Sequence, residues 1–327
     1  MIARALVQAL ADTGHRPSLV VTPDFGFGRT FATYRSNRRA AVGPVDCVIS
    51  LRYPSYAVRH PAHACWLNHT MREYYDLWPR FRATLSPLNA IKEGARRQMI
   101  RAADRWLLTH NVSRVAAQSR TIQHRLKIEL DVDADVIYPP PPQRPYRCDE
   151  YGDFVFAVSR LVPLKRLDLL IRALAEPPAL QIAVVIGGDG EALHDLRRLA
   201  GELGVESRVT FAGRLTDDQL LAHLASCRAV CYPPFEEDYG FVTAEAFASR
   251  KAVVTCTDSG GPAELVRHNE NGLVVDPTPA ALAEAMARMM EDKSLAERMG
   301  SEAAADASAM SWHDAVNGLL ERALARA

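Results

Sequence analysis

The second half of the chain alternates short apolar runs with segments of helical periodicity. Leucines three residues apart, such as Leu193, Leu196 and Leu199, form one apolar helix face, and similar patterns recur between the runs. Unbroken apolar runs are typical of strands that helices cover on both faces. The pattern therefore predicts an α/β domain with a doubly wound parallel sheet. Its strands are expected at residues 154–158, 182–186, 208–212, 229–232, 252–256 and 272–275.

The first half follows a looser version of the same pattern. The chain opens in an apolar helix face formed by Ile2, Ala5 and Leu6, whereas a parallel α/β domain normally opens with a strand. We therefore expect either that a first strand is absent from this chain or that the domain is built differently. A long basic helix is expected at residues 89–107, and strands are expected at residues 18–22, 47–50, 64–67, 115–119 and 136–138.

A segment rich in proline separates the two halves. Residues 139–153 have almost no apolar periodicity, which is typical of a linker. We expect one domain over residues 1–145 and a second over residues 146–310. A last helix within residues 311–327 can pack on either domain, and packing on the first would require it to cross back.

Composition adds a split of charge and excludes several classes of protein. The 327 residues carry no net formal charge, yet residues 1–150 hold 22 basic and 13 acidic side chains, against 17 and 26 in the remainder. With 48% hydrophobic residues, the chain is not of the disordered class. It has neither an apolar run long enough to span a membrane nor the pattern of a signal peptide. Its six cysteines form no Cys-x-x-Cys pair, so we expect reduced thiols and a cytoplasmic location.

The clearest chemical motif is a pair of glutamates with seven residues between them. Glu237 follows the strand expected at 229–232, and Glu245 is expected in the second turn of a helix that begins near Gly240. Ligands of open α/β sheets bind at the carboxyl ends of the strands, and free backbone N–H groups at a helix start can hold a phosphate. An ionised Glu245 only accepts hydrogen bonds, which suits a vicinal diol such as that of ribose. A solvated acidic loop is the alternative interpretation.

A second motif places two cations after the first strand of the second half. Arg160 and Lys165 lie in one loop and can flank an anion, although an ordinary exposed basic loop would look the same. The carboxyl ends of parallel strands meet at one crevice, so both motifs can serve one ligand. A diphosphate between the cations and the helix start, with its ribose on Glu245, is such a ligand.

Together these motifs resemble those of the family-4 (group 1) retaining glycosyltransferases. The resemblance rests on residues 158–168, 237–245 and 258–264, with Asn68-His69 and Tyr138-Pro139-Pro140 in the first half. It implies the GT-B fold, in which two Rossmann-like doubly wound domains face a central cleft. It also implies transfer of a hexose from a UDP- or GDP-linked sugar to a glycan, lipid or small-molecule acceptor, with no metal and no cofactor.

The resemblance also implies a role for individual residues. Arg160 and Lys165 match the positions that neutralise the leaving diphosphate, and Glu237 matches the residue that contacts the donor sugar. Glu245 matches the ribose ligand, and His69 would lie beside the reacting bond. The donor-binding set is completed by the backbone of Tyr239, Gly240, Phe241 and Val242 at the phosphate and sugar, and by Gly213 and Arg214 near the base.

The chain departs from the family pattern at several places. Arg250 and Asp238 stand where glycine is common, and a left-handed Arg250 would cost about 1–2 kcal/mol. The family's first strand and glycine-rich loop have no match, which puts the acceptor side of the first domain in doubt. Two further interpretations therefore stay open: an epimerase or phosphorylase of the same fold, and a truncated scaffold that binds a nucleotide sugar without turning it over.

Several other features of the sequence have simpler explanations. Asp131, Asp133 and Asp135 resemble a metal-binding pattern, but they fall between a helix and a strand and are interpreted as a solvated turn. Gly188 and Gly190 form only a partial dinucleotide fingerprint, so we set aside a dehydrogenase. The basic side chains of the first half form either a solvated face or a surface for an anionic membrane or a phosphorylated acceptor. No binding motif for nucleic acid accompanies them. Among these basic side chains, Arg97, Arg101 and Arg105 share one face of the helix expected at residues 89–107.

Overall fold

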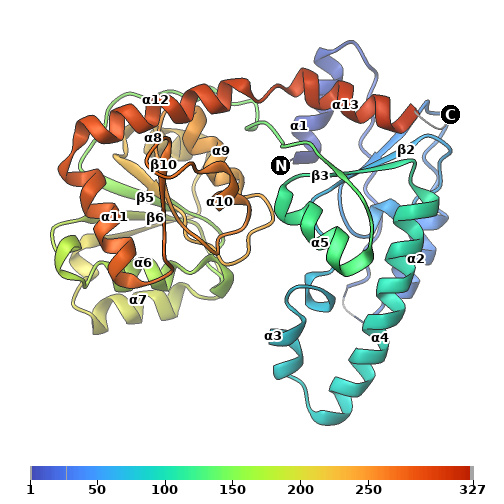
Figure 1. Ribbon diagram of the computed structural model, residues 1–327, viewed down its shortest axis with the longest axis horizontal. Coiled ribbons are helices and arrows are strands. Elements are labelled where there is room, and N and C mark those ends of the chain that lie inside the picture. Colours follow the sequence, from blue (N-terminus) through green and yellow to red (C-terminus); the bar gives the residue numbers. More distant parts are fainter. Residues whose placement is uncertain (1, 27, 325–327) are drawn as a thin grey trace. The chain divides into compact units, whose positions relative to one another are not determined.

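The computed structural model describes residues 2–26 and 28–324, and the chain divides into two units (Figure 1). The first unit comprises Met1–Pro139 together with Ser311–Ala327, and the second comprises Pro140–Met310. The last helix, α13 (Trp312–Leu324), therefore belongs to the first unit, where it packs against β2 (His63–Leu67) and α1 (Ile2–Asp12).

The first unit is built on a four-stranded parallel sheet. Its order is β1 (Val48–Ser50), β2, β3 (Arg114–Ala117) and β4 (Asp135–Val136). The remaining elements of this unit are α2 (Thr30–Arg38), η1 (Ser55–Ala57), η2 (Arg72–Tyr74), α3 (Trp78–Ala83), α4 (Pro87–Trp106), η3 (Leu107–Asn111) and α5 (Arg120–Leu130).

One predicted strand of the first unit does not form. Residues 18–22 lie in a segment without regular structure, and Leu19, Val20 and Val21 are 51%, 45% and 85% exposed. A β-branched run becomes a strand only where a neighbouring strand pairs with it. In the described part of this unit, β1 at the sheet edge pairs with β2 alone, so residues 18–22 have no strand partner.

The interior of the first unit contains a buried carboxylate. Asp104 of α4 is fully buried and accepts hydrogen bonds from the hydroxyls of Tyr56 at 2.5 Å, Tyr75 at 2.6 Å and Tyr34. Burial raises the pKa of Asp104 to about 6, while the three hydroxyl donors oppose that rise. Among the described residues, three neutral tyrosine hydroxyls rather than a cation bind this carboxyl.

The second unit is built on a six-stranded parallel sheet, which confirms the predicted doubly wound arrangement. The order is β10 (Gly272–Val275), β9 (Val253–Cys256), β8 (Ala229–Cys231), β5 (Phe154–Val158), β6 (Ala183–Gly187) and β7 (Val209–Gly213). Its helices are α6 (Leu167–Ala173), α7 (Leu193–Glu202), α8 (Asp217–Ser226), α9 (Phe241–Ala248), α10 (Gly261–Leu265), α11 (Pro279–Glu291) and α12 (Lys293–Ala309), with short turns η4 (Pro163–Lys165), η5 (Pro177–Ala179) and η6 (Glu206–Arg208).

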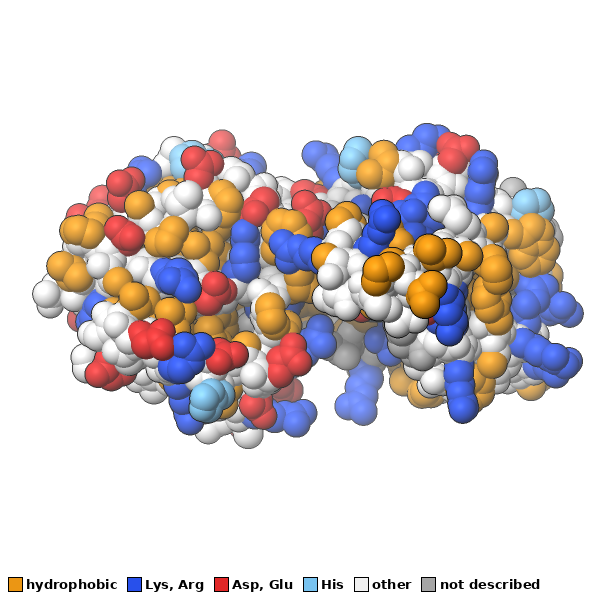
Figure 2. Space-filling model, turned by 90° about the horizontal axis from the view of Figure 1, so that it is seen from below, with side chains coloured by type: hydrophobic (Ala, Val, Ile, Leu, Met, Phe, Trp, Pro, Cys, Tyr) orange, Lys and Arg blue, Asp and Glu red, His pale blue; other side chains and the backbone are white. Residues whose placement is uncertain are grey.

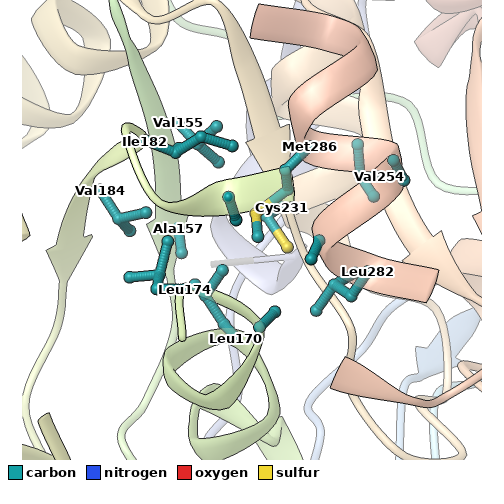
Figure 3. Close-up of a cluster of buried hydrophobic side chains, with 14 of the residues drawn as sticks. Val155, Ala157, Leu170, Leu174, Ile182, Val184, Cys231, Val254, Leu282 and Met286 are labelled. Carbon is teal, nitrogen blue, oxygen red and sulfur yellow. The ribbon is translucent and has the colours of Figure 1, made fainter. Parts of the chain in front are cut away.

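Helices cover both faces of this second sheet. Figure 1 shows α6 and α7 on one side of β5 and β6, and α8 and α9 on the other. Figure 3 shows the core between the sheet and α6 and α11, where Val155, Leu170 and Met286 are among the fully buried side chains. Apolar burial on both faces is the reason that the strands read as unbroken apolar runs in the sequence.

Candidate functional site

The second sheet has a switch point between β5 and β8. The chain runs from β5 outward through β6 to β7, and then returns to β8 and runs outward the other way through β9 to β10. The loops that follow β5 and β8 therefore diverge at their carboxyl ends, which is where open α/β sheets bind ligands. Lys165 follows β5 and Glu237 follows β8, so the two predicted motifs flank this switch point.

Lys165 and Glu237 are paired with each other at the switch point. The Lys165 Nζ atom lies 2.5 Å from Glu237 Oε2 and donates to the Tyr232 hydroxyl at 3.0 Å. The side chains of Lys165 and Glu237 are 11% and 20% exposed, so both remain open to solvent. Burial, and then the charge of Glu237, raise the pKa of Tyr232, which keeps its hydroxyl protonated. The pair offers one cation and one hydrogen-bond acceptor to a ligand.

Arg166 joins the loops that carry the motifs, and sequence reasoning missed it. Its backbone is left-handed, with φ of 49°, and its guanidinium donates to the carbonyl oxygens of Pro233 and Pro234, both at 2.8 Å. The same guanidinium makes two hydrogen bonds to Asp258, at 2.6 and 2.8 Å, beyond β9. Arg166 thus holds three strand-end loops together. Its adjacency to Lys165 was the available signal, but its partners lie far away in the sequence.

Glycines permit the close approach of two of these loops. A Cβ on Gly260 would lie 2.4 Å from the Glu237 carbonyl oxygen, and a Cβ on Gly261 would lie 2.5 Å from the Tyr239 Cα atom. Backbone N–H groups of Glu237 and Gly261 donate across the contact at 3.0 and 2.9 Å. The loop that carries Glu237 is therefore fixed by backbone contacts and leads directly into α9.

The start of α9 is also constrained. Gly240 caps the helix with φ of 80°, and a Cβ there would meet the Pro262 ring at 2.7 Å. Tyr239 is buried, and its ring packs edge-on against Phe241 with the ring centres 5.0 Å apart. The side chains thus anchor the helix start, and the first N–H groups of α9 remain the groups that an anion can use.

Glu245 lies in α9 and is far more buried than Glu237. Its side chain is 4% exposed, and its Oε1 atom lies 2.5 Å from Arg144 Nη1. The second Nη atom of Arg144 bonds Asp217, which begins α8, at 2.9 Å. Burial raises the pKa of Glu245 to about 7, and Arg144 opposes that rise. The motif therefore contains a second ion pair, and its cation, Arg144, was absent from the sequence-based site.

The remaining residues predicted to bind the donor sugar nucleotide follow different strands of the second sheet. Arg160 is exposed after β5, and within residues 2–26 and 28–324 its side chain has no ion-pair partner. Gly213 ends β7, the edge strand two positions from β5, with φ of 68°, and Arg214 beside it is exposed. Val242 is half-buried in the first turn of α9. The structure keeps all of these on one unit.

The predicted histidine belongs to the first unit. His69 follows β2, is half-buried, and has its Nδ1 atom 2.9 Å from the Thr70 carbonyl oxygen. His63, which opens β2, is fully buried with Nε2 at 2.8 Å from the Ser50 hydroxyl, and burial lowers its pKa to about 4. His63 is therefore a packing histidine of the first unit.

Two further predictions are settled by local geometry. Asp131 has φ of 50°, and Asp131 and Asp133 both pair with Lys127, so this stretch is a solvated turn as predicted. Arg250 is left-handed with φ of 56°, as its position after α9 suggested.

Neither a metal cluster nor a membrane-spanning helix is present among the described residues. In that part of the chain, no group of three or more His, Cys, Asp or Glu side chains could hold a metal ion. No helix among residues 2–26 and 28–324 is both long and apolar enough to cross a bilayer.

Sequence comparisons identify similar proteins. Residues 144–306 match the family described as Glycosyl transferases group 1. A D-inositol 3-phosphate glycosyltransferase of Nocardia farcinica is 32% identical over 254 residues, which are 72% of this chain and 56% of that protein. A GDP-mannose-dependent alpha-(1-6)-phosphatidylinositol monomannoside mannosyltransferase of Mycobacterium tuberculosis is 37% identical over 187 residues, 52% of this chain and 47% of that protein. The chain spans about half the length of these curated relatives.

Structure comparisons show the fold. A sucrose-phosphate synthase from Thermosynechococcus elongatus matches with a TM-score of 0.74 at 18% identity, over 96% of this chain and 90% of that chain. Anabaena HepE in complex with UDP matches with a TM-score of 0.61 at 23% identity, over 80% of this chain and 72% of that chain. The chain has the GT-B fold, and through residues 144–306 it belongs to the group 1 glycosyl transferase family.

Proposed function

We propose that this chain transfers a hexose from a nucleoside diphosphate sugar to an acceptor, with retention of configuration at the anomeric carbon. The observation that carries the proposal is the meeting of Lys165, Glu237 and the start of α9 at the switch point of the second sheet. Family membership supports the reaction class. The GDP-mannose-dependent relative and the UDP complex of HepE support a GDP- or UDP-linked donor.

The diphosphate is the leaving group, and cations stabilise it. In our proposal, Lys165, Arg160 and the N–H groups of α9 bind its oxygens as negative charge develops on them. The bond from the anomeric carbon to the diphosphate oxygen breaks, and a bond from the acceptor oxygen forms on the same face. The acceptor's proton passes to a diphosphate oxygen, so no protein nucleophile is required. Two local cations supply the charge that a metal would otherwise supply.

The remaining residues would hold the donor and acceptor. Glu237, at 20% exposure, is placed to accept hydrogen bonds from sugar hydroxyls, while the buried Glu245 would bind the ribose diol. The base would lie near Gly213 and Arg214. His69 and the rest of the first unit would serve the acceptor and the reacting bond.

A donor panel tests this proposal. The full chain is incubated with UDP- and GDP-hexoses and candidate acceptors, with and without EDTA, and released nucleotide and glycosylated product are quantified. We expect transfer with at least one donor, unaffected by EDTA, and lost in Glu237→Gln. Nucleotide release without transfer to any acceptor would favour the epimerase or phosphorylase class, and binding without turnover would favour a scaffold. Failure of every UDP and GDP sugar to bind would refute the donor site.

We also propose that the first unit contacts an anionic membrane, because one end of α4 combines exposed apolar and basic side chains. Leu88 and Ile91 are 81% and 73% exposed, and Arg80, Arg82 and Lys92 are exposed near them. In Figure 2 basic and hydrophobic side chains lie interspersed over the face of the first unit. Apolar side chains flanked by cations favour the interface of an anionic bilayer.

The arginine face of α4 contributes less than its sequence indicated. Arg97 and Arg101 share Glu129 of α5, and Arg105 pairs with Asp131, so part of their charge is compensated. Membrane contact therefore depends on the end of α4 that carries Leu88 and Ile91. We expect the full chain to float with vesicles of phosphatidylglycerol and not with phosphatidylcholine. Ile91→Glu should abolish flotation and Arg105→Ala should preserve it; equal flotation of all three proteins would contradict the proposal.

A further inference from the structure

The cation that faces Glu245 comes from the segment that opens the second unit, not from the two sequence motifs. Arg144 lies five residues after Pro139, and its guanidinium reaches Glu245 in α9 and Asp217 at the start of α8. Its side chain is 15% exposed, so it covers a carboxylate that is itself 4% exposed. Arg144 therefore bridges α8 and α9 at the buried Glu245, one of the predicted ligand groups.

We propose that Arg144 is a positioning residue for nucleotide binding: it favours the ionised form of Glu245 and orients this carboxylate to accept hydrogen bonds from the ribose diol of the donor. This inference rests on the proposed function, because it assigns a partner to the same donor site.

The geometry allows the two oxygens of the Glu245 carboxylate to have different partners. Arg144 uses Oε1 of Glu245 and leaves Oε2 for a further donor, such as a ribose hydroxyl. The Tyr146 hydroxyl is buried beside the same carboxyl and lowers its pKa, but across the described residues its contacts with Glu245 and Arg144 fall short of good hydrogen-bond geometry. A buried hydroxyl without a partner is costly unless a ligand or water satisfies it. A ligand hydroxyl beside Glu245 would give this buried hydroxyl and the second carboxylate oxygen a hydrogen-bond partner.

Electrostatics explain why a cation is needed at this position. A buried carboxylate without a cation takes up a proton rather than remaining charged. The groups that face Glu245 are Arg144 and Tyr146 from the opening segment, Asp217 from α8, and Tyr232 from the loop after β8. Arg144 is the single cation among these four, and Asp217 opposes it by raising the pKa of Glu245. Removal of Arg144 therefore shifts Glu245 toward its neutral form, which makes weaker hydrogen bonds to a diol.

Calorimetric titration with four nucleotides tests the inference. The probes are UDP and GDP, and their 2′,3′-dideoxy analogues, which lack the diol. In the wild type, loss of the diol should weaken binding about 10- to 100-fold, as expected for hydrogen bonds to a charged group. In Arg144→Ala at pH 7, the diol nucleotide should bind about tenfold more weakly than in the wild type, and the dideoxy analogue should be unchanged.

The pH profile and two further variants separate positioning from simple support of the fold. Affinity of the wild type for the diol nucleotide should fall as pH drops below about 7, and in Arg144→Ala this fall should begin at higher pH. Arg144→Lys keeps the cation and should restore the wild-type profile in part. Arg147→Ala, on the same segment and paired with the exposed Asp149, should change nothing.

Each outcome decides between the two proposals. If the wild type binds neither UDP nor GDP, the proposed function fails. If the wild type binds but Arg144→Ala weakens diol and dideoxy ligands equally, tightens binding of the diol ligand, or leaves its pH profile superimposed on the wild type, the role of Arg144 is wrong while the donor site stands.

Discussion

Two glutamates of the second unit, Glu237 and Glu245, are each paired with a cation, but the two carboxylates lie at different depths. Lys165 and Glu237 meet at the ends of strands, where Glu237 is 20% exposed. Arg144 and Glu245 meet against α9, where Glu245 is 4% exposed. The two cations are buried to a similar degree, so the difference lies in the carboxylates. A partly exposed carboxylate loses less than a buried one when its cation turns to a substrate. Within one motif, Glu237 is thus suited to contact the reacting sugar, and Glu245 is suited to bind the donor.

The largest expected effect distinguishes the two pairs by kinetics. Lys165→Ala should lower kcat about 100- to 1,000-fold, because it removes a preorganised charge from the leaving group. Glu245→Gln should instead raise the KM for the donor about tenfold or more, with a smaller change in kcat. Steady-state transfer assays measure both constants, with Lys293→Ala as a control at an exposed pair. Identical kinetic defects in Lys165→Ala and Glu245→Gln would remove the distinction.

The second comparison concerns stability. Arg144→Ala leaves a buried carboxylate without its cation and should lower the free energy of unfolding of the second unit by about 3 kcal/mol. Lys165→Ala leaves a more exposed carboxylate and should cost about 1 kcal/mol or less. Calorimetric unfolding measures this, and tryptophan fluorescence is a built-in control because Trp66, Trp78, Trp106 and Trp312 all belong to the first unit. A larger loss of unfolding free energy in Lys165→Ala than in Arg144→Ala would contradict the conclusion that Glu245 is the more buried carboxylate.

Glu245 should also make the stability of the second unit depend on pH. Its pKa is about 7 in the folded state against an ordinary value of 4.5, so folding favours the protonated form. The resulting stabilisation is complete below about pH 4.5 and is lost as pH rises to about 7, amounting to about 3 kcal/mol. Glu245→Gln should flatten this part of a stability profile recorded between pH 4.5 and 8. An unchanged slope in the variant would assign the dependence to other groups.

The smallest expected effect comes from the residue that follows α9. Arg250 is left-handed, and its side chain makes one exposed hydrogen bond, to Ser301. Arg250→Gly should relieve the strain and raise the free energy of unfolding by about 0.5–1 kcal/mol, with donor binding unchanged. A stabilised variant with altered binding would show that the end of α9 and the two ion pairs are coupled.

The sequence predicted the second unit better than the first, for physical reasons. The central strands β5, β8 and β9 of the second sheet are buried on both faces, so their apolar runs appear in the sequence. Residues 18–22 have the same β-branched character but no strand beside them, and a pairing partner cannot be deduced from local composition. The sequence did not predict Arg144 and Arg166 as site residues for a related reason. Their partners Glu245 and Asp258 lie 101 and 92 residues away in the chain. The spacing of a motif identifies its charged residues, but tertiary packing determines which distant side chains pair with those residues.

Titration of UDP and GDP against the wild type, Lys165→Ala, Glu245→Gln and Lys293→Ala tests the central claim most directly, since it asks whether the carboxyl edge of the second sheet binds a nucleoside diphosphate. We expect at least one nucleotide to bind the wild type and Lys293→Ala equally, and to bind Lys165→Ala and Glu245→Gln about tenfold or more weakly. Absence of binding to the wild type, or equal affinity in all four proteins, would contradict the site.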